Sequence, residues 1–146
     1  MATILLLSGP NLNLLGDRDP QHYGTTTLEE LVALARETAA KHGHELEHLQ
    51  SNHEGVLVDA IHAARGRCAA IVINAGALSH YSHAIADALA AFDGVKVELH
   101  LSNPYAREEW RHRSVLSGVV DGIAVGFRAT GYRIAVEAAA EMIAGR

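Results

Sequence analysis

Cysteine is almost absent from this chain of 146 residues, because Cys68 is the only one. An internal disulfide is therefore excluded, and a chain without disulfides is typical of a reducing compartment. There is also no run of 18 apolar residues, and the N-terminus enters a short apolar run without a basic segment or a cleavage-like site. We expect neither a membrane span nor a signal peptide, and hence a cytoplasmic protein.

Positive charge and aromatic side chains are also scarce. The formal net charge is −5, which argues against nucleic acid or an anionic membrane as a partner. Only 5% of the residues are aromatic, so few side chains could stack on a flavin or a nucleobase. The two lysines are Lys41, at the end of an expected helix, and Lys96, at the start of an expected strand. Schiff-base catalysis needs a lysine beside the ligand, so imine chemistry is disfavoured.

Apolar residues are plentiful, at 49% of the chain, and they follow an alternating pattern. We expect one domain over 1–146, because a chain of this length can bury its own core. Strand-like runs at 3–7, 45–50, 69–73, 95–101 and 122–125 alternate with helical patterns at 27–42, 54–64, 82–91 and 132–144. This alternation predicts an α/β, three-layer, flavodoxin-like fold with a five-stranded parallel sheet. Ligands of such sheets bind at the carboxyl ends of the strands.

The connection between the first strand and the first helix, residues 9–24, is unusually long. It shows no helical or strand pattern, whereas most such loops take about 2 to 6 residues. It carries three polar groups able to do chemistry, Asn11, Arg18 and Tyr23. We therefore expect a functional loop, a mobile lid with Gly16 and Gly24 as hinges.

Motifs for common cofactors are missing. The first turn lacks G-x-G-x-x-G, and no Gly-x-Ser-x-Gly elbow is present. Gly126 and Gly131 have the glycine spacing of a P-loop, but Tyr132 follows where that motif needs lysine. His80 and His83 are three residues apart, yet no second cluster completes a metal site. We expect neither a metal nor a cofactor.

Amide, hydroxyl, imidazole and guanidinium groups instead follow the strand ends, a set that suits a small, polyhydroxylated, anionic substrate. Four blocks carry a family resemblance: Gly-Pro-Asn-Leu-Asn-Leu-Leu-Gly at 9–16 with Arg18 and Tyr23, Gln-Ser-Asn-His-Glu-Gly at 50–55, Ile-Asn-Ala-Gly-Ala-Leu-Ser-His-Tyr-Ser at 73–82, and the segment 97–111. In order and content they resemble the type II 3-dehydroquinate dehydratases. The resemblance implies reversible anti elimination of water from 3-dehydroquinate through an enolate, giving 3-dehydroshikimate on the shikimate route to chorismate and aromatic amino acids.

The resemblance also assigns catalytic roles. Tyr23 matches the base that removes the proton beside the ketone. A tyrosine with an ordinary pKa of about 10 is ionised only about once in a thousand molecules at pH 7, and a nearby guanidinium favours the charged form. Arg18 matches the essential arginine. His100 matches the general acid, with Glu98 on the same strand face to support it, and Asn11 matches the residue that holds a water against the enolate oxygen.

Substrate binding is assigned in the same way. Asn74 and the backbone at Leu101 and Ser102 match the carboxylate site, whereas His80, Arg111 and Asp87 match the contacts to hydroxyl groups. In the family this aspartate reaches a neighbouring subunit's site, which implies a homo-oligomer of trimers, usually a dodecamer.

The resemblance is not complete, and one alternative remains open. Arg113 and Val115 stand where many members carry histidine and tyrosine, which affects loop packing rather than the chemistry. From the alternation and the polar sheet edge alone, a non-catalytic, flavodoxin-like module for a small anion or a nucleotide would also be possible. A copurified ligand without turnover would favour that alternative.

Overall fold

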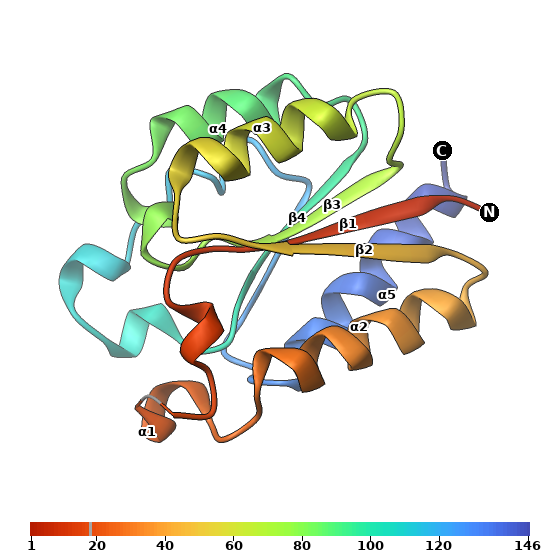
Figure 1. The fold of residues 1–146 in the computed structure, drawn as a ribbon. Coiled ribbons are helices and arrows are strands. Elements are labelled where there is room, and N and C mark those ends of the chain that lie inside the picture. Colours follow the sequence, from red (N-terminus) through yellow and green to blue (C-terminus); the bar gives the residue numbers. More distant parts are fainter. Residues whose placement is uncertain (18) are drawn as a thin grey trace.

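The computed structural model describes residues 1–17 and 19–146. Its centre is a five-stranded sheet of β1 (Thr3–Ser8), β2 (Glu45–Gln50), β3 (Ala70–Asn74), β4 (Val95–His100) and β5 (Gly122–Val125). The strands are all parallel and lie in the order β2-β1-β3-β4-β5 (Figure 1). This is the flavodoxin-like order, so the predicted fold class is confirmed.

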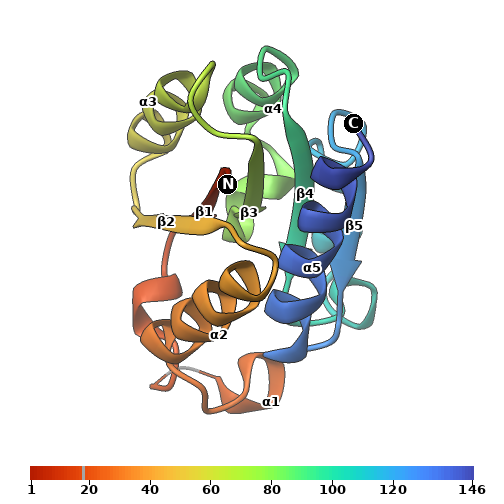
Figure 2. The ribbon, with the colours of Figure 1, turned by 90° about the vertical axis from the view of Figure 1, so that its right-hand side faces the viewer.

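Helices cover both faces of the sheet. The pair α2 (Leu28–Lys41) and α5 (Thr130–Ala144) lies on one face, and the pair α3 (Glu54–Ala64) and α4 (His83–Ala90) lies on the other (Figures 1 and 2). Successive residues of β1 point to opposite faces, so Ile4 and Leu6 pack toward the first pair while Leu5 and Leu7 pack toward the second. Because β1 is buried on both faces, its residues 4–7 are all apolar in the sequence.

Local signals in the sequence fix the helix ends. The Thr27 side chain accepts a hydrogen bond from the Glu30 backbone while the Glu30 carboxylate accepts one from the Thr27 backbone, and together these bonds form a capping box at the start of α2. Gly43 follows the last turn of that helix with a φ of 76°, a conformation that glycine adopts without a Cβ penalty. Of the helices in the described ranges, none is long and apolar enough to cross a membrane.

The segment between β1 and α2 differs from the prediction. It was expected to lack regular structure, but it contains a 3-10 turn, η1 (Leu12–Leu14), and a four-residue helix, α1 (Pro20–Tyr23). Three more 3-10 turns, η2 (Gly76–His80), η3 (Pro104–Ala106) and η4 (Glu109–Arg111), follow β3 and β4. A single turn is too short to show a hydrophobic period, which is why α1 left no pattern in the sequence.

All these short elements gather at the carboxyl end of the sheet. The two termini lie at the opposite end (Figure 1). Gly9 brings the ends of β1 and β3 together, because its backbone N–H donates to the Asn74 carbonyl at 2.8 Å. A Cβ on Gly9 would lie 2.3 Å from the Ala75 carbonyl oxygen, so only glycine permits this approach. The strand ends and the short turns together frame a cavity.

Candidate active site

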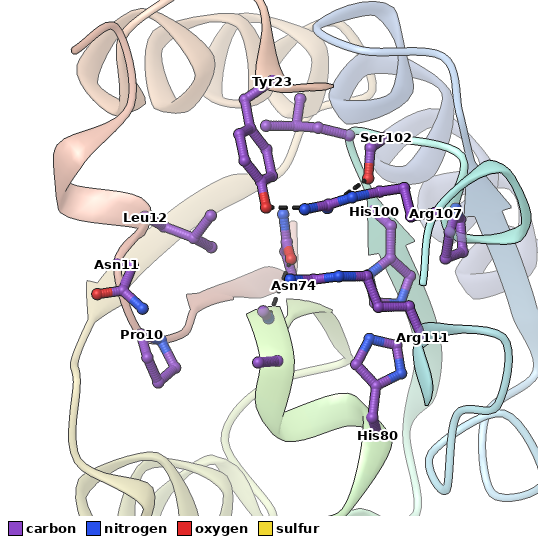
Figure 3. A pocket seen from close by; sticks show the side chains of 14 residues that line it. Pro10, Asn11, Leu12, Tyr23, Asn74, His80, His100, Ser102, Arg107 and Arg111 are labelled. Atoms are coloured by element: carbon purple, nitrogen blue, oxygen red, sulfur yellow. Dashed lines mark hydrogen bonds between the residues drawn. The ribbon is translucent and has the colours of Figure 1, made fainter. Parts of the chain in front are cut away.

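The cavity lies at the carboxyl ends of β1, β3 and β4, and Figure 3 shows its lining side chains. The lining residues are Pro10, Asn11, Leu12, Tyr23, Asn74, Gly76, Ala77, His80, His100, Leu101, Ser102, Pro104, Arg107 and Arg111. Most of the residues predicted for the site are among them. Glu98 lies behind His100 rather than in the cavity, and Asp87 is exposed on α4, away from it. Arg18 lies outside the described residues.

Tyr23 ends α1, and its hydroxyl points into the cavity (Figure 3). Arg107 Nη1 donates a hydrogen bond to the Tyr23 hydroxyl oxygen at 2.9 Å and a longer one to the Ser102 hydroxyl at 3.3 Å. The Arg107 guanidinium carbon also lies 5.1 Å from the centre of the Tyr23 ring. Only 7% of the Arg107 side chain is exposed, so little water screens its charge from the phenol. A positive group in this position stabilises negative charge on the Tyr23 oxygen.

His100 and Glu98 lie on one face of β4, as the two-residue period of a strand predicts. The His100 Nε2 atom is 2.6 Å from Glu98 Oε2, and the Glu98 side chain is 1% exposed. Burial alone would raise the pKa of this carboxyl group. The hydrogen bonds and positive charge of His100, with hydrogen bonds from Ser117 and Ser114, outweigh burial and hold the pKa of Glu98 below its usual range. Glu98 therefore stays ionised beside the His100 ring.

Two serines complete the surroundings of this carboxylate. Ser114 Oγ donates to Glu98 Oε2 at 2.7 Å, and Ser117 Oγ donates to Glu98 Oε1 at 2.6 Å. Both come from the irregular segment between η4 and β5. Each carboxylate oxygen is thus bonded, which fixes the orientation of Glu98 and, through it, the His100 ring. Since Nε2 faces the carboxylate, Nδ1 is the nitrogen of His100 that remains for a ligand.

His80 lies beside His100 on the cavity wall. Their rings are stacked with centroids 6.2 Å apart, and Trp110 packs edge-on to His80 at 5.4 Å. Burial lowers the pKa of His80, so the ring is neutral at pH 7. Its Nδ1 lies 2.7 Å from the Arg113 carbonyl oxygen, which can only accept a hydrogen bond. The Nδ1 therefore carries the hydrogen, and Nε2 is left as an acceptor for a hydroxyl group.

Asn74 ends β3 and is 97% buried, with 3% of its surface exposed. Its Oδ1 accepts from the Gly76 backbone at 3.2 Å, and its Nδ2 donates to the Tyr132 hydroxyl at 3.2 Å. Tyr132 is fully buried, and burial raises its pKa to about 12, so it remains a neutral phenol. These contacts fix the Asn74 amide and leave its second N–H for a ligand.

The remaining wall is cationic. The Arg111 guanidinium lies 4.0 Å from the centre of the Trp110 ring, and its Nε donates to Glu108 at 3.1 Å. With Arg107 it gives the cavity two guanidinium groups, which favour an anionic ligand. Asn11 lies across the cavity from these arginines (Figure 3). Its backbone N–H donates to Asn52 Oδ1 at 3.0 Å.

Sequence reasoning missed four residues that shape the site: Arg107, Ser114, Ser117 and Tyr132. Arg107 was inside a block that carries the family resemblance, and that block was the signal that could have identified it. The two serines and Tyr132 act through contacts made only when distant segments fold together, so no local pattern marks them. Among the described residues, no three His, Cys, Asp or Glu side chains are grouped to hold a metal ion.

Comparison with known proteins gives one consistent result. The profile of a family described as Dehydroquinase class II matches residues 2–140. The chain is 51% identical to catabolic 3-dehydroquinase 2 of Aspergillus flavus over 99% of its own length and 97% of that protein. It is 53% identical to a 3-dehydroquinate dehydratase of Corynebacterium glutamicum over 97% of its length and 98% of that protein. The crystal structure of the type II dehydroquinase of Propionibacterium acnes, at 42% identity, superimposes with a TM-score of 0.91 over 97% of both chains.

Proposed function

Because the chain belongs to the class II dehydroquinase family, we propose a division of that reaction among the residues of the cavity. The protein is a 3-dehydroquinate dehydratase, a hydro-lyase that converts 3-dehydroquinate to 3-dehydroshikimate and water. The reaction breaks a C–H bond beside a ketone and a C–O bond one carbon further on. It therefore needs a base, a place for negative charge on the ketone oxygen, and an acid for the departing hydroxyl.

The base in this proposal is Tyr23. Its hydroxyl points into the cavity and accepts a hydrogen bond from Arg107, whose buried charge stabilises the phenolate. In the sequence-based assignment Arg18 serves the same purpose. A phenolate takes the proton beside the ketone and leaves an enolate. Asn11, across the cavity, holds a water against the enolate oxygen, where hydrogen-bond donors stabilise developing charge.

The acid is His100. Glu98 occupies its Nε2, so the proton for the leaving hydroxyl comes from Nδ1. The ionised Glu98 stabilises the positive ring before that transfer. Because the base stands on α1 and the acid on β4, they approach the substrate from different walls of the cavity. This arrangement supports anti elimination.

The other lining groups bind the substrate. The second Nδ2 hydrogen of Asn74, with the backbone of Leu101 and Ser102, receives the carboxylate, and the neutral His80 accepts a hydroxyl hydrogen at Nε2. Arg111 donates to a second hydroxyl. No lysine lines this cavity in the described part of the chain, which supports an enolate rather than an imine.

Asp87 is exposed on α4 and does not line the cavity of its own chain. We propose that it completes the site of a neighbouring subunit in a trimer, with trimers joining to a dodecamer in the cytoplasm. Size-exclusion chromatography coupled to light scattering measures that assembly. A protein that turns over substrate as a monomer would contradict this part of the proposal.

Replacement of Tyr23 by phenylalanine tests the base directly. We expect Tyr23→Phe to lower kcat by about 10³-fold, because general base catalysis contributes roughly 10² to 10⁴. The assay follows the ultraviolet absorbance of the conjugated enone, and calorimetry with a substrate analogue checks that binding persists. Tyr81→Phe, at an exposed tyrosine outside the cavity, is the matched control. Full activity of Tyr23→Phe would remove Tyr23 as the base.

A further inference from the structure

Arg128 has an unusual backbone conformation. Three non-glycine residues in the described ranges have positive φ: Asn11 at 69°, Asp19 at 37° and Arg128 at 52°. Asparagine and aspartate tolerate this region comparatively well, whereas arginine has no local side-chain bond to offset its cost. Backbone strain of this kind persists only where the surrounding structure enforces it, and it clusters at functional sites.

The Arg128 side chain reaches α1, the short helix that ends in Tyr23. Its Nη2 donates to the Gln21 carbonyl at 2.7 Å and its Nη1 to the Pro20 carbonyl at 3.4 Å. The backbone N–H of Arg128 in turn donates to the carbonyl of Leu101, a cavity residue at the end of β4, at 3.0 Å. Arg128 therefore connects the backbone of α1 to the rim of the sheet.

The helix α1 depends on tertiary contacts, which include the packing of Tyr23 against the core beneath α2 and α5. It is one turn long and has no buried residue, and a turn of this length does not hold its shape alone. Its backbone bonds run from His22 and Tyr23 to the Asp19 carbonyl and from Gly24 to the Pro20 carbonyl. In a helix of one turn the carbonyls have few partners within the helix, and the planar fork of arginine can reach two neighbouring carbonyls, here those of Pro20 and Gln21.

Arg128 and Arg107 hold different parts of the same helix. Arg107 donates to the hydroxyl of Tyr23, at the tip of the side chain, whereas Arg128 donates to the backbone two and three residues before it. We propose that Arg128 is a positioning residue that fixes α1 so that the Tyr23 oxygen stays at the reacting carbon. The proposal rests on the proposed function, in which Tyr23 is the base.

Substitution of Arg128 should therefore affect stability and turnover differently. Glycine at position 128 relieves the positive φ but removes the guanidinium, so stability and turnover should change in different directions. Because Arg128 is exposed, water competes for the two carbonyls, and the loss in rate should be moderate.

The test compares three variants in the full chain. We expect Arg128→Gly to lower kcat by about tenfold with KM within about twofold, since misplacement of a catalytic group lowers the rate more than binding. Its Tm should equal or exceed that of the wild type. Arg128→Lys should recover part of the rate, because an ammonium reaches one carbonyl. Arg133→Ala, in the first turn of α5 and paired with Glu137, is the control and should leave kcat unchanged.

Amide hydrogen exchange supplies a readout that does not depend on turnover. The amides of His22, Tyr23 and Gly24 should exchange faster in Arg128→Gly than in the wild type or in Arg133→Ala. Wild-type kcat with unchanged exchange in Arg128→Gly would overturn the proposal. A fall in Tm and kcat together, with unchanged exchange at these three amides, would also overturn it. Full activity of Tyr23→Phe would instead refute Tyr23 as the base. The exchange result would then still test whether Arg128 fixes the backbone of α1.

Discussion

Ser117 is a small residue that contacts Glu98, the carboxylate behind the proposed general acid His100. Its hydroxyl is bonded to Glu98 Oε1, in surroundings where the carboxylate has 1% of its side chain exposed. Removal of this donor leaves a buried charge short of one hydrogen bond, which raises the pKa of Glu98 from its lowered value. The serine thus acts on the reaction through Glu98 and then through His100.

We therefore predict that Ser117→Ala moves the acidic limb of the kcat profile to higher pH. The reason is that Glu98 then takes up its proton at a higher pH and no longer supports the His100 cation. The measurement is kcat against pH for the wild type, Ser117→Ala and Ser117→Thr. The threonine variant keeps a hydroxyl and should restore the wild-type limb. A lower Tm with an unmoved limb would show a purely structural role.

The same shift has a stability counterpart with a definite sign. A carboxyl group whose pKa is lowered on folding contributes stability above its ordinary value, here 4.5, and loses it as pH falls through the folded pKa. The Ser117→Ala variant should have a smaller contribution of this kind, so its unfolding free energy should depend less steeply on pH in this acid range.

At the scale of residues, the sequence predicted which residues line the cavity better than it predicted which side chains they contact. Tyr23, Asn74, His80, His100 and Arg111 were predicted for one site, and all five line one cavity. The partner of Tyr23 was expected five residues earlier, at Arg18, which lies outside the described residues; the structure places Arg107 on the Tyr23 hydroxyl. That contact spans 84 residues, a separation that no periodicity or cap can indicate.

At the scale of elements, the end of β1 is where the fold and the site depend most on each other. Gly9 lies against the loop after β3, between Asn11 on one strand end and Asn74 on the other. We predict that Gly9→Ala lowers the unfolding free energy by about 2 to 4 kcal/mol, because its Cβ would press on the Ala75 backbone. It should also lower kcat by separating the two strand ends. Urea unfolding and the enone assay measure both effects.

Gly118→Ala is the matched control for that variant. A Cβ at Gly118 would meet no atom within 4 Å, and its φ is not in the left-handed range. Its stability should stay within about 0.5 kcal/mol of the wild type. Equal stability of Gly9→Ala and Gly118→Ala would contradict the claim that the β1–β3 approach is tight.

Long elements were more predictable than single turns. The limits of α3 and of strands β2 and β5 agree with those predicted, and the other long elements differ by one or two residues at their ends. Their periods extend over several residues, and caps such as Thr27 and Gly43 mark their limits. The helix α1 and the four 3-10 turns are too short for a period, and tertiary contacts such as those of Arg128 hold α1.

At the scale of the whole molecule, the topology explains why distant residues share one cavity. All five strands run in the same direction, so everything that follows a strand is delivered to one edge of the sheet. The alternation of strands and helices indicated this edge from the sequence alone. The proposed assembly has no such signal in the sequence pattern, because an exposed residue such as Asp87 carries no pattern that would distinguish a subunit contact from a solvated surface.

The central claim is that two groups on different walls divide the reaction: Tyr23 removes the proton and His100 protonates the leaving hydroxyl. Incubation of 3-dehydroquinate with enzyme variants in D₂O separates the two steps, with NMR to follow the hydrogen beside the ketone. We predict that His100→Ala exchanges this hydrogen for deuterium without forming the enone, while Tyr23→Phe does neither. Exchange that persists in Tyr23→Phe, or that disappears in a folded His100→Ala, would contradict the account.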